Sequence, residues 1–444
     1  HYNYAPSNRW GLFPMASVGW RVSEESFIRD NVSFLSDLKL RASIGTVGQP
    51  VGSPFQYIQG YVVGSGGPYE FIDDTQVFGI AAPEPANAKL SWADVTTTNL
   101  ALDLGVLDNM FTLTTEVYQR FQDGLPAKRN VSLTDTYGGG LPEENLNQRI
   151  TRGLEFVLGH KNSVGDLSYS VNVNYNLART MWLHREGEAY TNSYDEWRNR
   201  REDRWEGIIW AQNYIGPFTS ADELRNSALQ NGSDGNITRA LPGDFRYEDV
   251  NGDGVIDGDD RSPILSDGTP RTNFGLNLDL FWKGFDFNML LQGQTGHTLK
   301  FDEVYGQIFA FRGNTPAYFH DRWRKEDPYN LDSEWIPGEW PVSRAIGDMP
   351  GNSYTESSVW RRDASFLRLK SLQLGYTFKS DIISKVGISS MRIYATGFNL
   401  LTFTDPWVKP HDPERSNNGP GLGYNAGFGY PLAKTYTVGL SINL

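Results

Sequence analysis

Long runs in which apolar and polar residues alternate constrain this chain more than any other feature of its sequence. Across positions 167–177 the odd residues are Leu, Tyr or Val, and the even residues are Ser or Asn. The same alternation ends the chain over 436–444, and a further apolar row occupies the even positions of 274–282. A period of two predicts β-strands with one apolar and one polar face. We therefore expect an all-β protein.

The length of these runs favours a transmembrane barrel. Soluble sandwiches also alternate, but their strands usually have about 5–6 residues, and these runs are much longer. Tilted strands that cross a bilayer need roughly 9–11 residues within the hydrocarbon. Aromatic residues near the ends of the rows also suit the girdles of membrane barrels. A large soluble β protein that is secreted and binds calcium remains the alternative on pattern alone.

The connections between the runs fall into a short set and a long set. Short turns are predicted at 107–109, 162–165 and 283–284, and they all fall on one side of the sheet. Outer-membrane barrels have short periplasmic turns and long extracellular loops. The long loops are 48–91, 126–145, 182–270, 296–365 and 403–432. The predicted barrel strands are 13–22, 37–47, 92–105, 110–124, 146–161, 166–181, 271–282, 285–295, 366–378, 389–402 and 433–444.

Two further runs, 55–63 and 207–216, would break this alternation of sides, so we expect them inside extracellular loops. The remaining count is odd, at about 11 strands, whereas single-chain outer-membrane barrels have an even number. An open sheet edge finds no water in lipid, so the first and last strands need partners. The count is consistent with half of a barrel of about 22 strands with a plugged lumen.

Composition excludes several classes of function. The formal charge of −13, from 40 basic and 53 acidic residues, argues against a nucleic-acid partner. The chain has no cysteine, which excludes disulfides and thiolate metal sites. The six histidines lack zinc-ligand spacing, and the sequence has neither a phosphate-binding loop nor a nucleophile elbow. We therefore do not expect an enzyme.

Several short segments are more specific than the alternation. They resemble, in order along nearly the whole chain, segments of the SusC/RagA-like TonB-dependent transporters. The strongest match is 242–257, whose sequence is Pro-Gly-Asp-Phe-Arg-Tyr-Glu-Asp-Val-Asn-Gly-Asp-Gly-Val-Ile-Asp. The other matching segments are 10–25, 38–45, 282–287, 367–370, 374–376, 399–400, 412–414, 430–431 and 434–440.

The resemblance implies that residues 1–444 are the C-terminal part of a transmembrane antiparallel barrel, about 11 of 22 strands, with the plug absent from this chain. Such transporters lie in the outer membrane of Bacteroidota-type bacteria, in contact with its lipid. The resemblance implies import of oligosaccharides or peptides with a SusD-like surface lipoprotein as partner. TonB would supply energy through the missing plug, and SusCD pairs would form a dimer. The alternative is a SusC-like barrel that serves as a structural scaffold in a larger complex.

Residues 249–260 have the ligand spacing of an EF-hand calcium loop. Gly254 stands where that loop turns sharply, and an Asp replaces the usual Glu at the twelfth position. Closely spaced oxygen ligands repel one another unless a cation neutralises them. We therefore expect a structural Ca²⁺ that braces loop 182–270, and a solvated Asp/Gly turn is the alternative. The predicted ligands are Asp249, Asn251, Asp253, Val255 through its carbonyl, Asp257 and Asp260.

The predicted extracellular loops are rich in tryptophan. Flat aromatic faces stack on sugars or bury peptide side chains, and aromatic anchors also dominate protein interfaces. The candidate cargo-binding residues are Trp182, Trp210, Trp340 and Trp360. The alternative for each is packing within the core of a loop or against the SusD-like partner.

Overall fold

A computed structural model gives the structure of the protein. It describes residues 1–72, 75–81, 84–130, 140–187, 189–230, 240–301, 314–343, 356–378, 387–414 and 432–443. The chain divides into two compact units. Unit 1 comprises residues 1–162 and 172–206, and unit 2 comprises 163–171 and 207–444. Each unit is described separately below.

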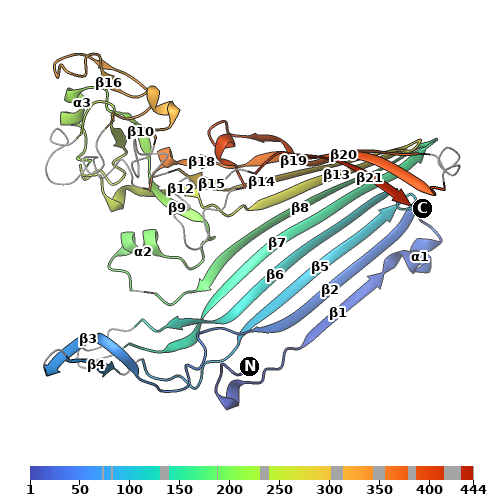
Figure 1. Cartoon of the computed structure of the whole chain (residues 1–444). Helices are drawn as coiled ribbons and strands as arrows, with labels where there is room; N and C mark the ends of the chain where they lie inside the picture. The colour runs from blue at the N-terminus through green and yellow to red at the C-terminus, as the bar shows by residue number, and fades with distance from the viewer. Residues whose placement is uncertain are drawn as a thin grey trace. The chain divides into compact units, whose positions relative to one another are not determined.

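An antiparallel sheet of eleven strands dominates the fold (Figure 1). Each predicted barrel strand is present, in the predicted order, which confirms the assignment made from the alternation. In order across the sheet, the strands are β1 (Met15–Arg21), β2 (Leu35–Gln49), β5 (Ala93–Val106), β6 (Phe111–Lys128), β7 (Glu143–Val164), β8 (Leu167–His184), β13 (Thr272–Trp282), β14 (Phe285–Thr295), β19 (Phe366–Thr377), β20 (Ser390–Thr404) and β21 (Thr435–Asn443).

The smaller elements lie outside this sheet and form separate hairpins and pairs. In unit 1 they are β3 (Val62–Ile72) with β4 (Thr75–Ala81), α1 (Ser26–Arg29) and α2 (Ser193–Asn199). In unit 2 they are β9 (Ile208–Gln212) with β12 (Arg261–Ser266), β10 (Tyr214–Pro217) with β11 (Phe245–Tyr247), β15 (Thr298–Lys300) with β18 (Arg361–Asp363), β16 (Arg324–Lys325) with β17 (Trp335–Ile336), and α3 (Ala221–Asn226).

Both strand-like runs that would have broken the pattern lie outside the main sheet. The run 207–216 forms β9 and the start of β10, as expected for a loop strand. The prediction of a strand at 55–63 was wrong for most of its length, because residues 54–57 form turns and β3 begins only at Val62. Phe55, the first residue of this run, has a φ of 64°, a left-handed conformation that interrupts an extended strand.

The short turns are tight because their residues adopt left-handed backbone conformations. Between β13 and β14 only Lys283 (φ 47°) and Gly284 (φ 90°) remain, the geometry of a two-residue hairpin turn. Between β5 and β6 the residues 107–109 all have positive φ, and β7 and β8 are joined through Gly165. We call this end of the strands the turn end, and the opposite end the loop end.

In unit 1 the two faces of the sheet differ sharply in chemistry. One face, here called the polar face, carries ion pairs and side-chain hydrogen bonds between neighbouring strands. Arg41 of β2 lies 2.7 Å from Asp103 of β5, and Asn176 of β8 donates to Glu155 of β7 at 2.6 Å. On the opposite face, Ile44 is 53% exposed and Leu100 is 60% exposed. Exposed aliphatic rows of this kind suit contact with lipid rather than water.

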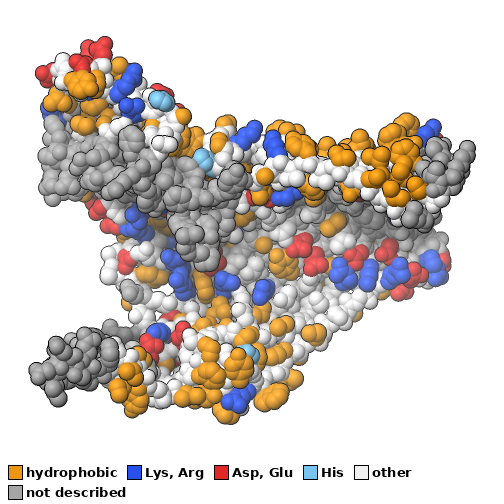
Figure 2. Space-filling model, viewed as in Figure 1, with side chains coloured by type: hydrophobic (Ala, Val, Ile, Leu, Met, Phe, Trp, Pro, Cys, Tyr) orange, Lys and Arg blue, Asp and Glu red, His pale blue; other side chains and the backbone are white. Residues whose placement is uncertain are grey.

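On part of the surface, acidic and basic side chains alternate in a row (Figure 2). No helix among the described residues is long and apolar enough to cross a membrane.

Candidate functional site

Three of the predicted loops in unit 2 share one hydrophobic core, which we call the aromatic loop core. Phe245 comes from loop 182–270, Trp340 and Trp360 come from loop 296–365, and Trp407 from loop 403–432 packs against them. The Trp360 ring lies 5.6 Å from Phe245 and 6.2 Å from Trp340, between ring centroids. The other members are Tyr247, Ile256 and Phe319, with Tyr214, Ala228, Tyr318 and Val359 packed against it.

This core decides between the roles that the sequence left open for two of the tryptophans. Trp340 is 3% exposed and Trp360 is 1% exposed, so both pack the core of the loops and present no free face to cargo. Trp182 and Trp210 remain half-buried. Trp182, at the loop end of β8, lies 5.5 Å from the Arg149 guanidinium and 5.6 Å from that of Arg185.

The backbone of the predicted calcium loop turns at two glycines. Gly252 and Gly254 have φ values of 76° and 84°, which other residues rarely adopt. The first carboxylate of the loop, Asp249, accepts from the backbone N–H of both glycines, at 2.8 and 2.9 Å. Asp253 likewise accepts from Val255 at 2.8 Å. The carboxylates at the first and fifth positions are thus held by the loop's own backbone.

The end of the calcium loop is anchored in the protein interior. Asp260 is fully buried, and its two oxygens accept from the backbone N–H of Val250 at 2.9 Å and of Asp257 at 2.8 Å. Ile256 belongs to the aromatic loop core and donates to the Leu229 carbonyl at 2.7 Å. Among the described residues, no three His, Asp or Glu side chains gather as a metal centre, so the calcium site stays a prediction.

A buried ion network joins two of the segments that resemble the SusC/RagA-like family. Arg368 of β19, with a side chain 3% exposed, lies 2.6 Å from Asp412 and also contacts Glu414. Lys370, two residues along the same strand, lies 3.0 Å from Glu414. No local signal predicts that segments 367–370 and 412–414 meet, because more than forty residues separate them.

Asp412 is the centre of this network. Besides Arg368, its carboxylate accepts from the backbone N–H of Glu414 at 3.0 Å and of Leu432 at 2.9 Å. Burial raises the pKa of the Asp412 carboxyl, but the hydrogen bonds from Arg368 and from the two N–H groups outweigh it and hold that pKa below its usual value. The carboxylate therefore stays charged and ties both flanks of 415–431 to β19.

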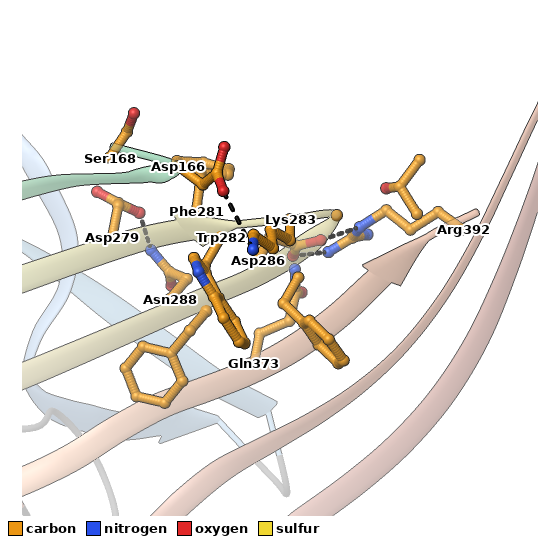
Figure 3. Close-up of a pocket in the computed structure, with 14 residues that line it drawn as sticks. Asp166, Ser168, Asp279, Phe281, Trp282, Lys283, Asp286, Asn288, Gln373 and Arg392 are labelled. Carbon is orange, nitrogen blue, oxygen red and sulfur yellow. Dashed lines mark hydrogen bonds and ion pairs between the residues drawn. The ribbon is translucent and has the colours of Figure 1, made fainter. Parts of the chain in front are cut away.

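Unit 2 also contains a cavity of about 630 Å³ beside the β13–β14 turn (Figure 3). Four of its five charged groups form ion pairs: Asp286 lies 2.5 Å from Arg392, and Asp166 lies 3.2 Å from Lys283. Asn288 donates to Asp279 at 2.6 Å. The pairing leaves these carboxylates suited to holding the strands in register rather than to acid–base chemistry.

The chain is similar to known receptors over almost its whole length. No protein-family model matches it. It is 26% identical over 459 residues to TonB-dependent receptor P3 of Formosa agariphila, covering 99% of this chain and 42% of the relative. It is 27% identical over 451 residues to TonB-dependent receptor SusC of Bacteroides thetaiotaomicron, covering 99% of this chain and 40% of the relative. The chain thus spans less than half the length of these relatives.

Solved structures share its fold. The RagAB peptide importer in its open-open state matches with a TM-score of 0.73 at 19% identity, over 100% of this chain and 44% of that chain. A further structure of the RagAB peptide transporter matches with a TM-score of 0.69, over 99% of this chain and 44% of that chain. Sequence likeness to the receptors and this likeness of fold agree: the chain is a segment of an outer-membrane β-barrel, similar to part of the TonB-dependent receptors, SusC among them.

Proposed function

We propose that the receptor containing this chain imports oligosaccharides or peptides across the outer membrane. The observation that carries the proposal is similarity over 99% of the chain to TonB-dependent receptors, SusC among them. The polar face of unit 1 supports it, since a wall of charged and amide groups suits the passage of hydrophilic cargo. The eleven strands would be completed by strands elsewhere in the receptor, because lipid excludes an open edge.

We further propose a SusD-like lipoprotein as extracellular partner and TonB as the source of energy. The proposal of these two partners rests on the similarity of the chain to the TonB-dependent receptor SusC and on its likeness of fold to the RagAB importer. In cells, deletion of the gene for the full receptor should abolish uptake of one labelled pool, either oligosaccharides or peptides, and the full gene should restore it. A proton uncoupler should stop the restored uptake. Unchanged uptake of every pool in the deletion strain would overturn import. Purification of the full receptor in detergent should recover the lipoprotein with it.

We also propose that residues 249–260 hold a structural Ca²⁺. The support is the EF-hand spacing, the two left-handed glycines and the carboxylates held by backbone N–H groups. Four of the six predicted ligands are aspartates, and a bound cation would relieve the repulsion among them as their oxygens converge on it. Because Ile256 lies in the aromatic loop core, an ion bound here would stiffen the point where the loop joins that core.

Calcium should therefore stabilise the receptor. A ligand at a hundredfold excess over its Kd stabilises the folded state by about 2.7 kcal/mol, provided that it binds only that state. We expect isothermal titration of the EDTA-treated full receptor to show one site, which the double variant Asp249→Asn/Asp253→Asn loses. Asp222→Asn is the control, since this exposed carboxylate in α3 pairs only with Arg225 among the described residues. Titration with no binding heat, and a melting temperature that chelation leaves unchanged, would exclude the site.

A further inference from the structure

A cluster of arginines lies on the polar face of unit 1, toward the loop end. Arg149 of β7 lies opposite Gln122 of β6 and donates to its side-chain oxygen at 3.0 Å. Gln122 in turn donates to Gln49 of β2 at 3.2 Å. Hydrogen-bonded side chains from β2, β6 and β7 thus form a row that passes over β5. Beside its Arg149 end, the Trp182 ring contacts the guanidiniums of both Arg149 and Arg185. The row fixes the position of the Arg149 guanidinium.

Two of the three guanidiniums in this cluster have no ion pair with a described carboxylate. Arg185 is exposed. The Glu202 carboxylate accepts from its backbone N–H at 2.7 Å, but the Arg185 guanidinium has no ion pair with any carboxylate that the structure describes. Arg120, two residues from Gln122 and on the same face, is exposed and has no hydrogen bond or ion pair with a described residue. Glu206 lies 3.9 Å from Arg149, at the limit of an ion pair.

The surroundings of the arginines are amides and hydroxyls. Arg120 lies between Thr97 of β5 and Thr151 of β7, and the Thr151 hydroxyl lies 2.9 Å from that of Thr180. Guanidinium groups bind carboxylates and sulfates through two parallel hydrogen bonds. Amides and hydroxyls suit the hydroxyl groups of a sugar, whereas a peptide would require apolar pockets for its side chains.

We propose that Arg120, Arg149 and Arg185 form a cargo subsite for an acidic oligosaccharide, one that carries carboxylate or sulfate groups. Trp182 positions two of the guanidiniums by cation–π contact, which uses none of their N–H groups as hydrogen-bond donors to another side chain. The subsite gives the proposed import a substrate class, and in that sense it rests on the proposed function.

The test is binding to the purified full receptor in detergent, which does not depend on import. The probes are hexagalacturonate, a sulfated carrageenan hexasaccharide, neutral maltohexaose and hexaglutamate. We expect one of the two acidic sugars to bind at least about tenfold more tightly than maltohexaose, which is about 1.4 kcal/mol. That affinity should fall as salt is raised, because the partners are exposed charges. The carboxylate and sulfate probes distinguish which acidic group the site prefers.

Variants locate the binding. Arg149→Gln/Arg185→Gln should remove the preference for the acidic sugar, and Arg120→Gln should weaken it. The matched control is Arg152→Gln, which removes one charge from the same strand on the opposite face, where Arg152 donates to Gln119 at 3.1 Å. It should leave affinity unchanged.

Any of three results would overturn the subsite. The acidic sugars could bind no better than maltohexaose, or hexaglutamate could bind as tightly as the acidic sugars. The third result is a loss of affinity for the acidic sugar in Arg152→Gln equal to that in Arg149→Gln/Arg185→Gln. Import would stand in each of these cases if cells still take up a labelled pool. Conversely, tight binding that depends on Arg149 and Arg185, in a receptor that restores no uptake, would support the subsite and overturn import.

Discussion

Replacement of Arg368 by Ala should destabilise unit 2 by about 3–5 kcal/mol, the usual cost of leaving a buried charge without its partner. The variant removes the cation that faces Asp412 and Glu414, whose side chains are 8% and 17% exposed. Lys370 would still neutralise Glu414, at 3.0 Å, but nothing among the described residues would replace the ion pair of Asp412. We expect a lower melting temperature of the full receptor in detergent, and faster hydrogen exchange at the Leu432 amide, which donates to Asp412.

Two comparisons make this result specific to the network. Arg225→Ala breaks an ion pair in which both side chains are more than half exposed, so it should change stability by less than about 1 kcal/mol. Arg368→Lys keeps the charge but cannot contact Asp412 and Glu414 through a planar guanidinium. Its loss of stability should lie between those of Arg368→Ala and Arg225→Ala. Equal melting temperatures for Arg368→Ala and Arg225→Ala would show that the buried network contributes nothing to the stability of unit 2.

The strands could be predicted from the sequence because their signal is local. Alternation across a dozen residues assigns both the strand and its faces, and a short turn such as Lys283–Gly284 joins neighbours without ambiguity. The prediction of a strand at 55–63 failed because that run lacks regular alternation and was assigned from its residue types alone. Aromatic and β-branched residues occur there, but Phe55 in a left-handed conformation and the turns around it prevent an extended strand.

The contacts between loops could not be predicted in this way. Nothing near Asp412 in the sequence shows that its partner is Arg368, because only the fold brings the two together. The aromatic loop core could not be predicted for the same reason, because its rings come from three different loops. In the sequence alone, a tryptophan that packs in a core cannot be distinguished from one that binds a ligand. The calcium loop is intermediate. The spacing of its predicted ligands can be recognised in the local sequence, whereas the packing of Ile256 in the aromatic loop core is visible only in the structure.

Replacement of Trp360 by Ala should be the most damaging change in the aromatic loop core. The ring is 1% exposed and contacts Phe245 and Trp340, so its loss leaves a large cavity that costs about 3–5 kcal/mol. Trp360→Phe should recover part of this stability, since a smaller ring still fills some of the space. Trp197→Ala is the control, because that ring is 46% exposed in α2 and its loss should cost little.

Hydrogen exchange on the full receptor would measure the change in Trp360→Ala at two reporters. One is the Phe301 amide, which donates to the Trp360 carbonyl at 2.7 Å, and the other is the Ile256 amide, which donates to Leu229. Ile256 belongs both to this core and to the proposed calcium loop, so loosening the core should also weaken calcium binding. The coupling is reciprocal. Saturating calcium should slow hydrogen exchange at the Phe301 amide by the same factor by which the intact core raises the affinity of the loop for calcium. Fast exchange at Phe301 with unchanged exchange at Ile256 would show that the loops open separately and that the core does not unite them.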